Sequence, residues 1–257
     1  METIKNATVQ QSAKHLIKGI LTTTAYYQLA ASLLLASVFT TTTWAQQYQP
    51  PSGDPPSGPL VSNGSRNGCG EQYEIPLTVL APTTHVGQTT TTTPTLTWFV
   101  PATDTYRVEV SFYTLDQQDQ PNELVQLLEY VGNASGIVEF TLPTNESGLR
   151  ADQRYLWQVR IACTPDSPIY DQSFVSVIDV KTPPAELTLA LDRAQTPSEK
   201  ADIYASAGYW YDALREARLS PDGLERNQLT QSLLAELVAS ESGQHGEFLT
   251  QIADHVD

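Results

Sequence analysis

Few residues in this chain of 257 residues are spaced in a way that could support catalysis or metal binding. His245, Glu247, Asp254 and His255 lie near the end of the sequence, and imidazole and carboxylate groups are common metal ligands. Their spacing matches no standard motif, so we predict no metal site and no cofactor. Glycoside hydrolysis needs two carboxylates, but 29 acidic residues always offer pairs, and no local sequence marks two of them.

The sequence lacks the common catalytic signatures. It contains no nucleophile elbow, no HExxH pair, no phosphate-binding glycine loop and no dinucleotide-binding fingerprint. We therefore predict that the protein is not an enzyme.

The charge balance excludes two classes of partner. The chain has 14 Lys and Arg against 29 Asp and Glu, which gives a net charge of −15. Nucleic-acid binding requires a basic surface that replaces phosphate counterions, so we expect no nucleic-acid partner. The same charge argues against docking on anionic lipid.

The first 45 residues have the features of a secretory signal peptide. Three lysines precede the apolar segment 29–39, which is too short to span a bilayer comfortably. A Thr-Trp-Ala sequence then predicts cleavage between Ala45 and Gln46. Cleavage would give a periplasmic or secreted product with no stable membrane anchor. The alternative is an uncleaved segment that lies on or anchors in the membrane.

Removing the leader makes the chain more acidic, because three lysines but only one acid, Glu2, are lost. The mature chain would carry 28 acidic and 11 basic residues, a net charge of −17.

The mature chain divides into three parts by composition. Residues 46–68 are rich in Pro, Gly, Ser and Gln, which predicts a flexible linker. Residues 69–183 contain seven short segments without intervening helices, most of which alternate between apolar and polar positions, which predicts an antiparallel β-sandwich. The segment Leu124–Val131 is apolar in both phases and is interpreted as a strand rather than a helix. The predicted strands are Ile75–Leu80, Thr95–Val100, Arg107–Phe112, Leu124–Val131, Val138–Leu142, Arg154–Ile161 and Phe174–Val180.

Residues 184–257 change to helical spacing. Thr196 and Glu199 flank Pro197 in the pattern of a capping box, which marks the start of a helix. The segment Tyr204–Ala213 shares its spacing with a single tetratricopeptide helical hairpin, and a further helix follows. We therefore expect a small helical region that packs on the sandwich.

Two features of the predicted sandwich resemble fibronectin type III and Ig-like modules. Trp98 lies on an early strand, as does the core tryptophan of such modules. Tyr155 follows Leu149 by six residues, which resembles a tyrosine corner, where the hydroxyl bonds to upstream backbone. We expect Trp98, Tyr155 and Trp157 to be core residues.

The two cysteines suit a disulfide. Cys69 precedes the first predicted strand and Cys163 closes a later one. Export implies an oxidising compartment, where two cysteines are most simply one disulfide. It would close a loop of about 95 residues and contribute about 4–5 kcal/mol at most on the chain-entropy model. Free or metal-binding thiols are the alternative.

Taken in order, several motifs resemble one family along most of the chain. They are Arg66–Cys69, Thr92–Pro101, Tyr155–Cys163 and Gly208–Leu214. This order is similar to the cyanobacterial exported family catalogued as domain of unknown function 928. The family usually has a Gly-Trp-Ile-x-Arg-like stretch after the second cysteine, whereas this chain has Val175–Val180. The family has no established activity, so the resemblance implies compartment and architecture alone.

These observations predict an exported, non-catalytic module that binds a protein or a cell-envelope component. Strand edges and the aromatic residues Tyr209, Trp210 and Tyr211 are the candidate contact surfaces. The alternative is a carbohydrate-binding module or a cryptic glycan hydrolase, which would show exposed aromatic rings or paired carboxylates in a cleft. A third possibility is a structural role in which the acidic surface serves solubility.

Overall fold

The computed structural model describes residues 48–52, 75–101, 104–144 and 148–256. Residues from Gln46 onward group into one compact unit. None of the helices in the described ranges is long and apolar enough to cross a membrane. The predicted cleavage site at Ala45 and Gln46, and Cys69, lie outside these ranges.

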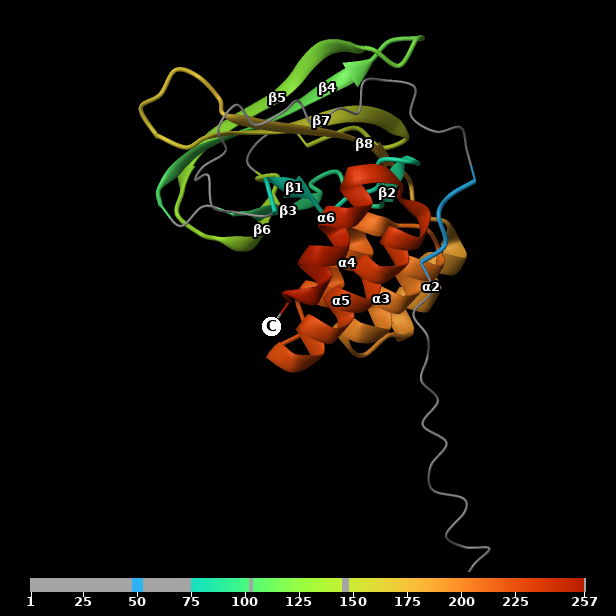
Figure 1. The fold of residues 1–257 in the computed structure, drawn as a ribbon. Coiled ribbons are helices and arrows are strands. Elements are labelled where there is room, and N and C mark those ends of the chain that lie inside the picture. Colours follow the sequence, from blue (N-terminus) through green and yellow to red (C-terminus); the bar gives the residue numbers. More distant parts are fainter. Residues whose placement is uncertain (1–47, 53–74, 102–103, 145–147, 257) are drawn as a thin grey trace, which may run out of the picture. The chain divides into compact units, whose positions relative to one another are not determined.

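Eight strands form two sheets in the described part of the unit (Figure 1). One sheet has three strands in the order β1-β3-β6, and the other has five in the order β2-β8-β7-β4-β5. All neighbours are antiparallel except β2 and β8. The strands are β1 (Thr78–Val79), β2 (Gly87–Thr89), β3 (Thr95–Val100), β4 (Tyr106–Leu115), β5 (Pro121–Gly132), β6 (Gly136–Thr141), β7 (Gln153–Ala162) and β8 (Gln172–Val180).

The mainly antiparallel β-structure agrees with the alternation in the sequence, and each of the seven predicted segments overlaps a strand. Strand β2 is the one described strand that the sequence does not predict. It has only three residues and pairs in parallel with β8, so it has too few positions to show an alternating pattern.

The inward side chains of both sheets belong to one hydrophobic core, the arrangement expected of a sandwich. Trp98 on β3 and Trp157 on β7 are fully buried, and Tyr155 is buried beside them. The Tyr155 hydroxyl accepts a hydrogen bond of 2.9 Å from the backbone N–H of Arg150. The upstream bond predicted for this tyrosine is therefore present, and the three residues predicted for the core are in it.

Five helices follow the last strand. Helix α3 begins with the predicted capping box, in which the Thr196 side chain accepts from the backbone N–H of Glu199 and the Glu199 side chain accepts from that of Thr196. The helices are α2 (Ala185–Arg193), α3 (Pro197–Ser206), α4 (Trp210–Arg218), α5 (Gly223–Ser240) and α6 (Gly243–Asp254).

Helix α4 joins the helices to the sheets through three consecutive side chains. Trp210 Nε1 donates to the backbone oxygen of Leu80 at 2.8 Å. The next residue, Tyr211, accepts a bond of 2.8 Å from Nε1 of Trp157. The third, Asp212, accepts from the backbone N–H of Thr90 at 2.7 Å. All three side chains are buried, so this helix completes the core of the sandwich.

Two glycines leave room for this packing. A Cβ atom on Gly87 would lie 2.7 Å from the ring of Tyr211, which is too close for any other residue without a shift. Gly208 has a φ angle of +84°, a left-handed conformation that glycine adopts without strain, and it forms the turn between α3 and α4.

The segment 48–52 packs against the helices, although the sequence predicts a flexible linker over 46–68. Tyr48 is buried, and its ring meets the edge of Trp210 at a centroid distance of 5.0 Å. Its hydroxyl lies 2.7 Å from Nε2 of His85, and the N–H of Gln49 donates to the oxygen of Ala205 at 3.1 Å. The linker prediction is therefore wrong for these residues, because a single tyrosine in a polar stretch gives no periodic signal.

Replacing Asp212 with asparagine tests the cost of the buried carboxylate. Burial raises the pKa of Asp212 from 3.8 to about 6, against the lowering effect of hydrogen bonds from Thr89 and Thr90. A carboxyl group with a raised pKa stabilises the fold most below its ordinary pKa, and that contribution is lost as the pH rises through about 6. We expect Asp212→Asn to raise the free energy of unfolding by about 1–3 kcal/mol near pH 8 and to have little effect near pH 4.

Denaturant unfolding at the two pH values measures this difference. Asp192→Asn is the control, because it removes one acid from the exposed surface of α2 and should change stability by less than about 0.5 kcal/mol. An Asp212→Asn variant that is less stable than the wild type near pH 8 would contradict the argument.

Candidate functional site

The aromatic residues predicted to bind a partner are part of the core. Tyr209, Trp210 and Tyr211 are 7%, 0% and 3% exposed. Trp210 and Tyr211 bond to the sheets as described above, and Tyr209 packs edge-on against Tyr204 at a centroid distance of 6.3 Å. The sequence-based assignment of an aromatic contact surface is corrected here, because these rings meet the protein's own strands and helices.

The predicted disulfide stays a prediction. Cys69 lies outside the described residues. Cys163 follows β7, and its backbone N–H donates to Oδ2 of Asp171 at 2.8 Å. This bond closes the base of the loop 163–171, which connects β7 and β8.

The C-terminal histidines serve different local contacts. Nε2 of His245 lies 3.1 Å from the backbone oxygen of Ala81, and its ring packs on Phe174. Burial lowers the pKa of the His245 imidazole. His255 Nδ1 lies 2.7 Å from the backbone oxygen of Gln251. Across the described ranges, no group of three or more His, Cys, Asp or Glu side chains is placed to hold a metal ion.

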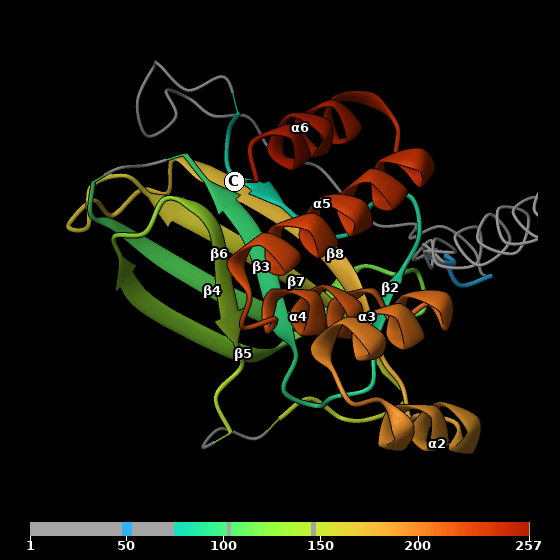
Figure 2. The same cartoon turned by 90° about the horizontal axis from the view of Figure 1, so that it is seen from below.

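The most exposed apolar surface of the sheets lies on β5. This strand is at the border of the five-stranded sheet, and β4 is its only neighbour among the described strands (Figure 2). Leu127 and Val131 are 51% and 61% exposed, and no other strand of the described part carries exposed large apolar side chains. We call the exposed apolar residues of this strand the β5 surface; they are Leu124, Val125, Leu127 and Val131.

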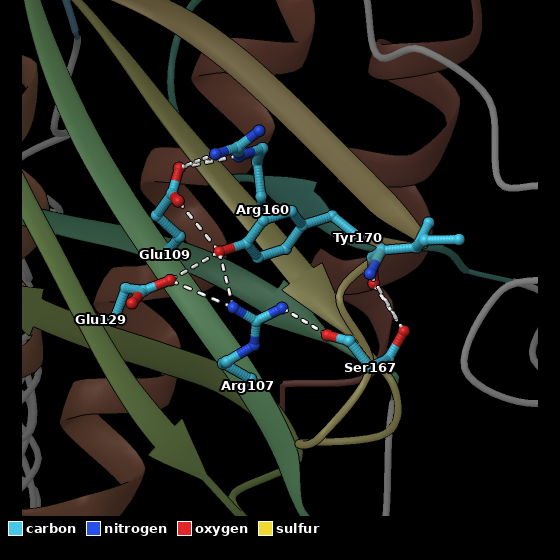
Figure 3. Close-up of polar contacts among 7 residues, drawn as sticks. Arg107, Glu109, Glu129, Arg160, Ser167 and Tyr170 are labelled. Carbon is cyan, nitrogen blue, oxygen red and sulfur yellow. Dashed lines mark hydrogen bonds and ion pairs between the residues drawn. The ribbon is translucent and has the colours of Figure 1, made fainter.

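A polar network lies on the sheet beside the β5 surface (Figure 3). Glu109 on β4 and Glu129 on β5 are directly opposite in the register of the two strands. Like charges in opposite positions destabilise a sheet unless they are compensated. Arg160, the register partner of Glu109 on β7, forms an ion pair with it, and Arg107 forms one with Glu129 at 3.1 Å.

Tyr170, from the loop 163–171, completes this network. Its hydroxyl lies 2.9 Å from Oε2 of Glu109 and 2.7 Å from Oε1 of Glu129, and so it bridges the two carboxylates. Its ring lies between two guanidinium groups, 4.5 Å from Cζ of Arg107 and 4.2 Å from Cζ of Arg160. Such cation–π contacts are worth about 0.5–2 kcal/mol each.

The network positions the loop 163–171 on the sheet. Burial, and then hydrogen bonds to Glu129 and Glu109, raise the pKa of the Tyr170 hydroxyl, so it stays protonated and donates. Both carboxylates are neutralised by arginines. Arg107 also donates to the backbone oxygen of Ser167 at 2.5 Å, which fixes the loop over the sheet.

The β5 surface and the network together form a mixed face. Val131 is the register partner of Arg107, so an exposed apolar side chain lies directly beside the arginine–tyrosine stack. Exposed Ile169 adds a further apolar side chain from the loop. Aromatic residues and arginine are enriched in protein interfaces, and apolar side chains form their cores.

The comparisons with known proteins identify a family. The family model described as Domain of Unknown Function (DUF928) matches residues 61–243, so the chain belongs to that family, as the motif order in the sequence indicated. No curated protein matches.

One similar solved structure is described as "Structure of Astrotactin-2, a conserved vertebrate-specific and perforin-like membrane protein involved in neuronal development". The match has 10% sequence identity and a TM-score of 0.29, and it covers 71% of this chain and 37% of that chain. A likeness at this level carries no argument about this protein.

Replacing Tyr170 with phenylalanine tests the bridge between the two glutamates. The variant keeps the ring between the arginines but removes the hydroxyl that joins the carboxylates. We expect it to lower the free energy of unfolding by about 1–2 kcal/mol and to speed amide exchange in the loop 163–171. Denaturant unfolding and hydrogen-exchange mass spectrometry measure the two effects.

Tyr113→Phe is the matched control. Tyr113 lies on the neighbouring strand β4 and is partly exposed, and its hydroxyl makes no hydrogen bond within the described residues. It should therefore leave stability and loop exchange unchanged. Equal effects of the two substitutions would show that the hydroxyl of Tyr170 does not hold the loop.

Proposed function

We propose that this protein is an exported, non-catalytic module that binds a protein or a cell-envelope component through the β5 surface. The observation that carries this proposal is a long strand at a sheet border with exposed apolar side chains. The partner would contribute an extended segment that pairs with β5 as an additional strand, and apolar side chains of that segment would cover Leu127 and Val131.

Over most of its length, strand β5 lacks the features by which proteins usually protect the border of a sheet. Strands at a border are normally short, charged, bulged or covered, because unpaired backbone groups beside apolar side chains promote association. Strand β5 has 12 residues, and its register with β4 is irregular only near the beginning of β5. Over the stretch from Leu127 to Val131 it carries one charged residue, Glu129, which is already paired with Arg107.

The sandwich type is part of the proposal. We infer an Ig-like or fibronectin III-like sandwich from the division into β1-β3-β6 and β8-β7-β4-β5, with β2 added beside β8. The hydroxyl bond of Tyr155 to the upstream backbone supports the same inference. Strands at the borders of such sandwiches are available for strand addition.

Export and origin also belong to the proposal. We propose cleavage after Ala45, a periplasmic or secreted product and a cyanobacterial source. The first described residue, Tyr48, is buried against Trp210 only three positions beyond the predicted cut, which is consistent with a mature domain that starts there. A product with one disulfide between Cys69 and Cys163 would suit that compartment.

Two observations support a non-catalytic role: the neighbouring acidic residues are paired with arginines, and the tryptophan rings are buried. Glu109 and Glu129 are close together, but each is paired with an arginine, which opposes a role as acid or base. The alternative of a carbohydrate-binding module needs exposed rings in a line. Trp98, Trp157 and Trp210 are all buried, which counts against it.

Site-specific photo-crosslinking tests the proposed surface. A photoreactive side chain at Leu127, introduced into the full chain expressed in its own host, should form one discrete adduct with an envelope or exported protein. The same group at Leu224, which is 69% exposed on α5, is the control and should form none. Val131 belongs to the same β5 surface, so Val131→Lys would place a charge in the apolar contact. It should reduce the yield of the adduct at position 127 by about tenfold.

Two outcomes would contradict the proposal. One is an equal pattern of adducts from both positions, or no adduct from either. The other is an adduct with twice the mass of the chain, which would make the partner a second copy rather than an envelope component.

A further inference from the structure

A cavity of about 380 Å³ lies where the three-stranded sheet meets the helices. Its wall includes Phe99 from β3, Glu139 from β6, Arg218 from α4, Arg226 from α5 and Ile252 from α6. Figure 2 shows β3 and β6 together with these helices. The volume falls within the range of about 300–1,000 Å³ that is common for small-molecule sites.

The charge of this cavity differs from that of the rest of the protein. The chain has a net charge of −15, yet the cavity is lined by two arginines against one acid, Glu139. His255 also lines it. Arg218 is paired with Glu139, and Arg226, which is only partly buried, adds a second guanidinium group to the same concave site.

The fold does not use all the donors of these two guanidinium groups. Arg226 makes no side-chain hydrogen bond and no ion pair with any described residue. Nε of Arg218 lies 3.2 Å from Oε2 of Glu139, but the N–H is not aligned with the carboxylate. This buried nitrogen therefore has no hydrogen-bond partner within the described part of the chain. A buried donor without a partner is costly, and a ligand oxygen would satisfy it.

The remainder of the wall is mixed, with polar side chains from Asn227 and His255 and four apolar side chains. Phe99 and Ile137 come from the sheet, and Ile252 and Val256 come from the last helix and the residues after it. Guanidinium groups recognise the oxygens of phosphate and carboxylate in paired hydrogen bonds. The four apolar side chains in the same wall can contact a short hydrocarbon part of such a ligand.

We propose that this cavity binds a small organic anion, with its phosphate or carboxylate oxygens on Arg218 and Arg226 and a short apolar group against Phe99 and Ile252. Glu139 competes with the ligand for Arg218. The cavity lies on β3, β6 and the helices, whereas the β5 surface lies on the other sheet. Anion binding in the cavity is therefore independent of partner binding at the β5 surface.

Calorimetric titration of the mature chain at low ionic strength tests the site, with hexyl phosphate, hexanoate and inorganic phosphate as probes. We expect hexyl phosphate or hexanoate to bind, and inorganic phosphate to bind about tenfold more weakly than hexyl phosphate because it lacks the apolar group. Arg226→Gln should weaken the binding of the alkyl anion by about tenfold. The fold should tolerate this change, because the guanidinium of Arg226 has no partner among the described residues.

Glu139→Gln provides a result in the opposite direction. Removing the competing carboxylate should tighten anion binding several-fold, and a gain in affinity cannot come from loss of folding. Arg193→Gln, on the exposed surface of α2, is the control and should change nothing. Equal affinities of the wild type and Arg226→Gln, or no binding of any probe up to about 10 mM, would overturn the proposal. Equal binding of hexyl phosphate and inorganic phosphate would overturn the apolar part of it.

Discussion

The attachment of helix α4 to the sheets is the constraint on which the rest of the structure depends. Trp210, Tyr211 and Asp212 are consecutive, and each makes a buried hydrogen bond to a different segment. The partners are Leu80 after β1, Trp157 on β7 and Thr89 on β2. Buried donors and acceptors that lose their partners cost about 1–3 kcal/mol each. If α4 left its position, the indole N–H of Trp157 would lose its partner inside the core. The sheets therefore require the helix, and the helices are part of the same compact unit.

This attachment determines which surfaces remain for other molecules. The aromatic residues at the start of α4, which the sequence suggests as a contact surface, are buried against the protein's own strands and helices. What remains exposed is the border strand β5, beside a network that holds the loop 163–171 in place through Tyr170. On the helical side of the described part, one concave feature is a cavity with two arginines. The described residues therefore present a mixed apolar and charged face and a cavity with two arginines.

The sequence predicts the regular elements well, because their signals are local. Alternation together with β-branched and aromatic composition identifies seven strands, and Thr196 with Glu199 marks the start of α3. The spacing of Tyr155 after Leu149 also predicts the hydroxyl bond that the structure contains. Features that depend on tertiary packing are not predicted. The sequence of a Trp-Tyr pair is the same whether the two rings bind a partner or pack in the protein core. Only the tertiary structure shows that Trp210 and Tyr211 are buried.

The residues of the proposed sites likewise come together only through tertiary packing, so the sequence does not predict them as sites. Glu109, Glu129 and Tyr170 come from two strands and a loop, so no spacing links them in the sequence. Arg218 and Arg226 are close in sequence, but their cavity also needs β3 and β6. Strand β5 is predicted as a strand, and its apolar residues on both faces are the one local sign that its outer face is unusual.

Native-state amide hydrogen exchange of the protein tests most directly whether the sheets and helices form one unit through α4. The account predicts that the slowest amides of α4 and of β7 exchange with free energies that agree within about 1 kcal/mol, because neither can open without the other. Exchange of all α4 amides through a local opening, several kcal/mol below the value for β7, would contradict it.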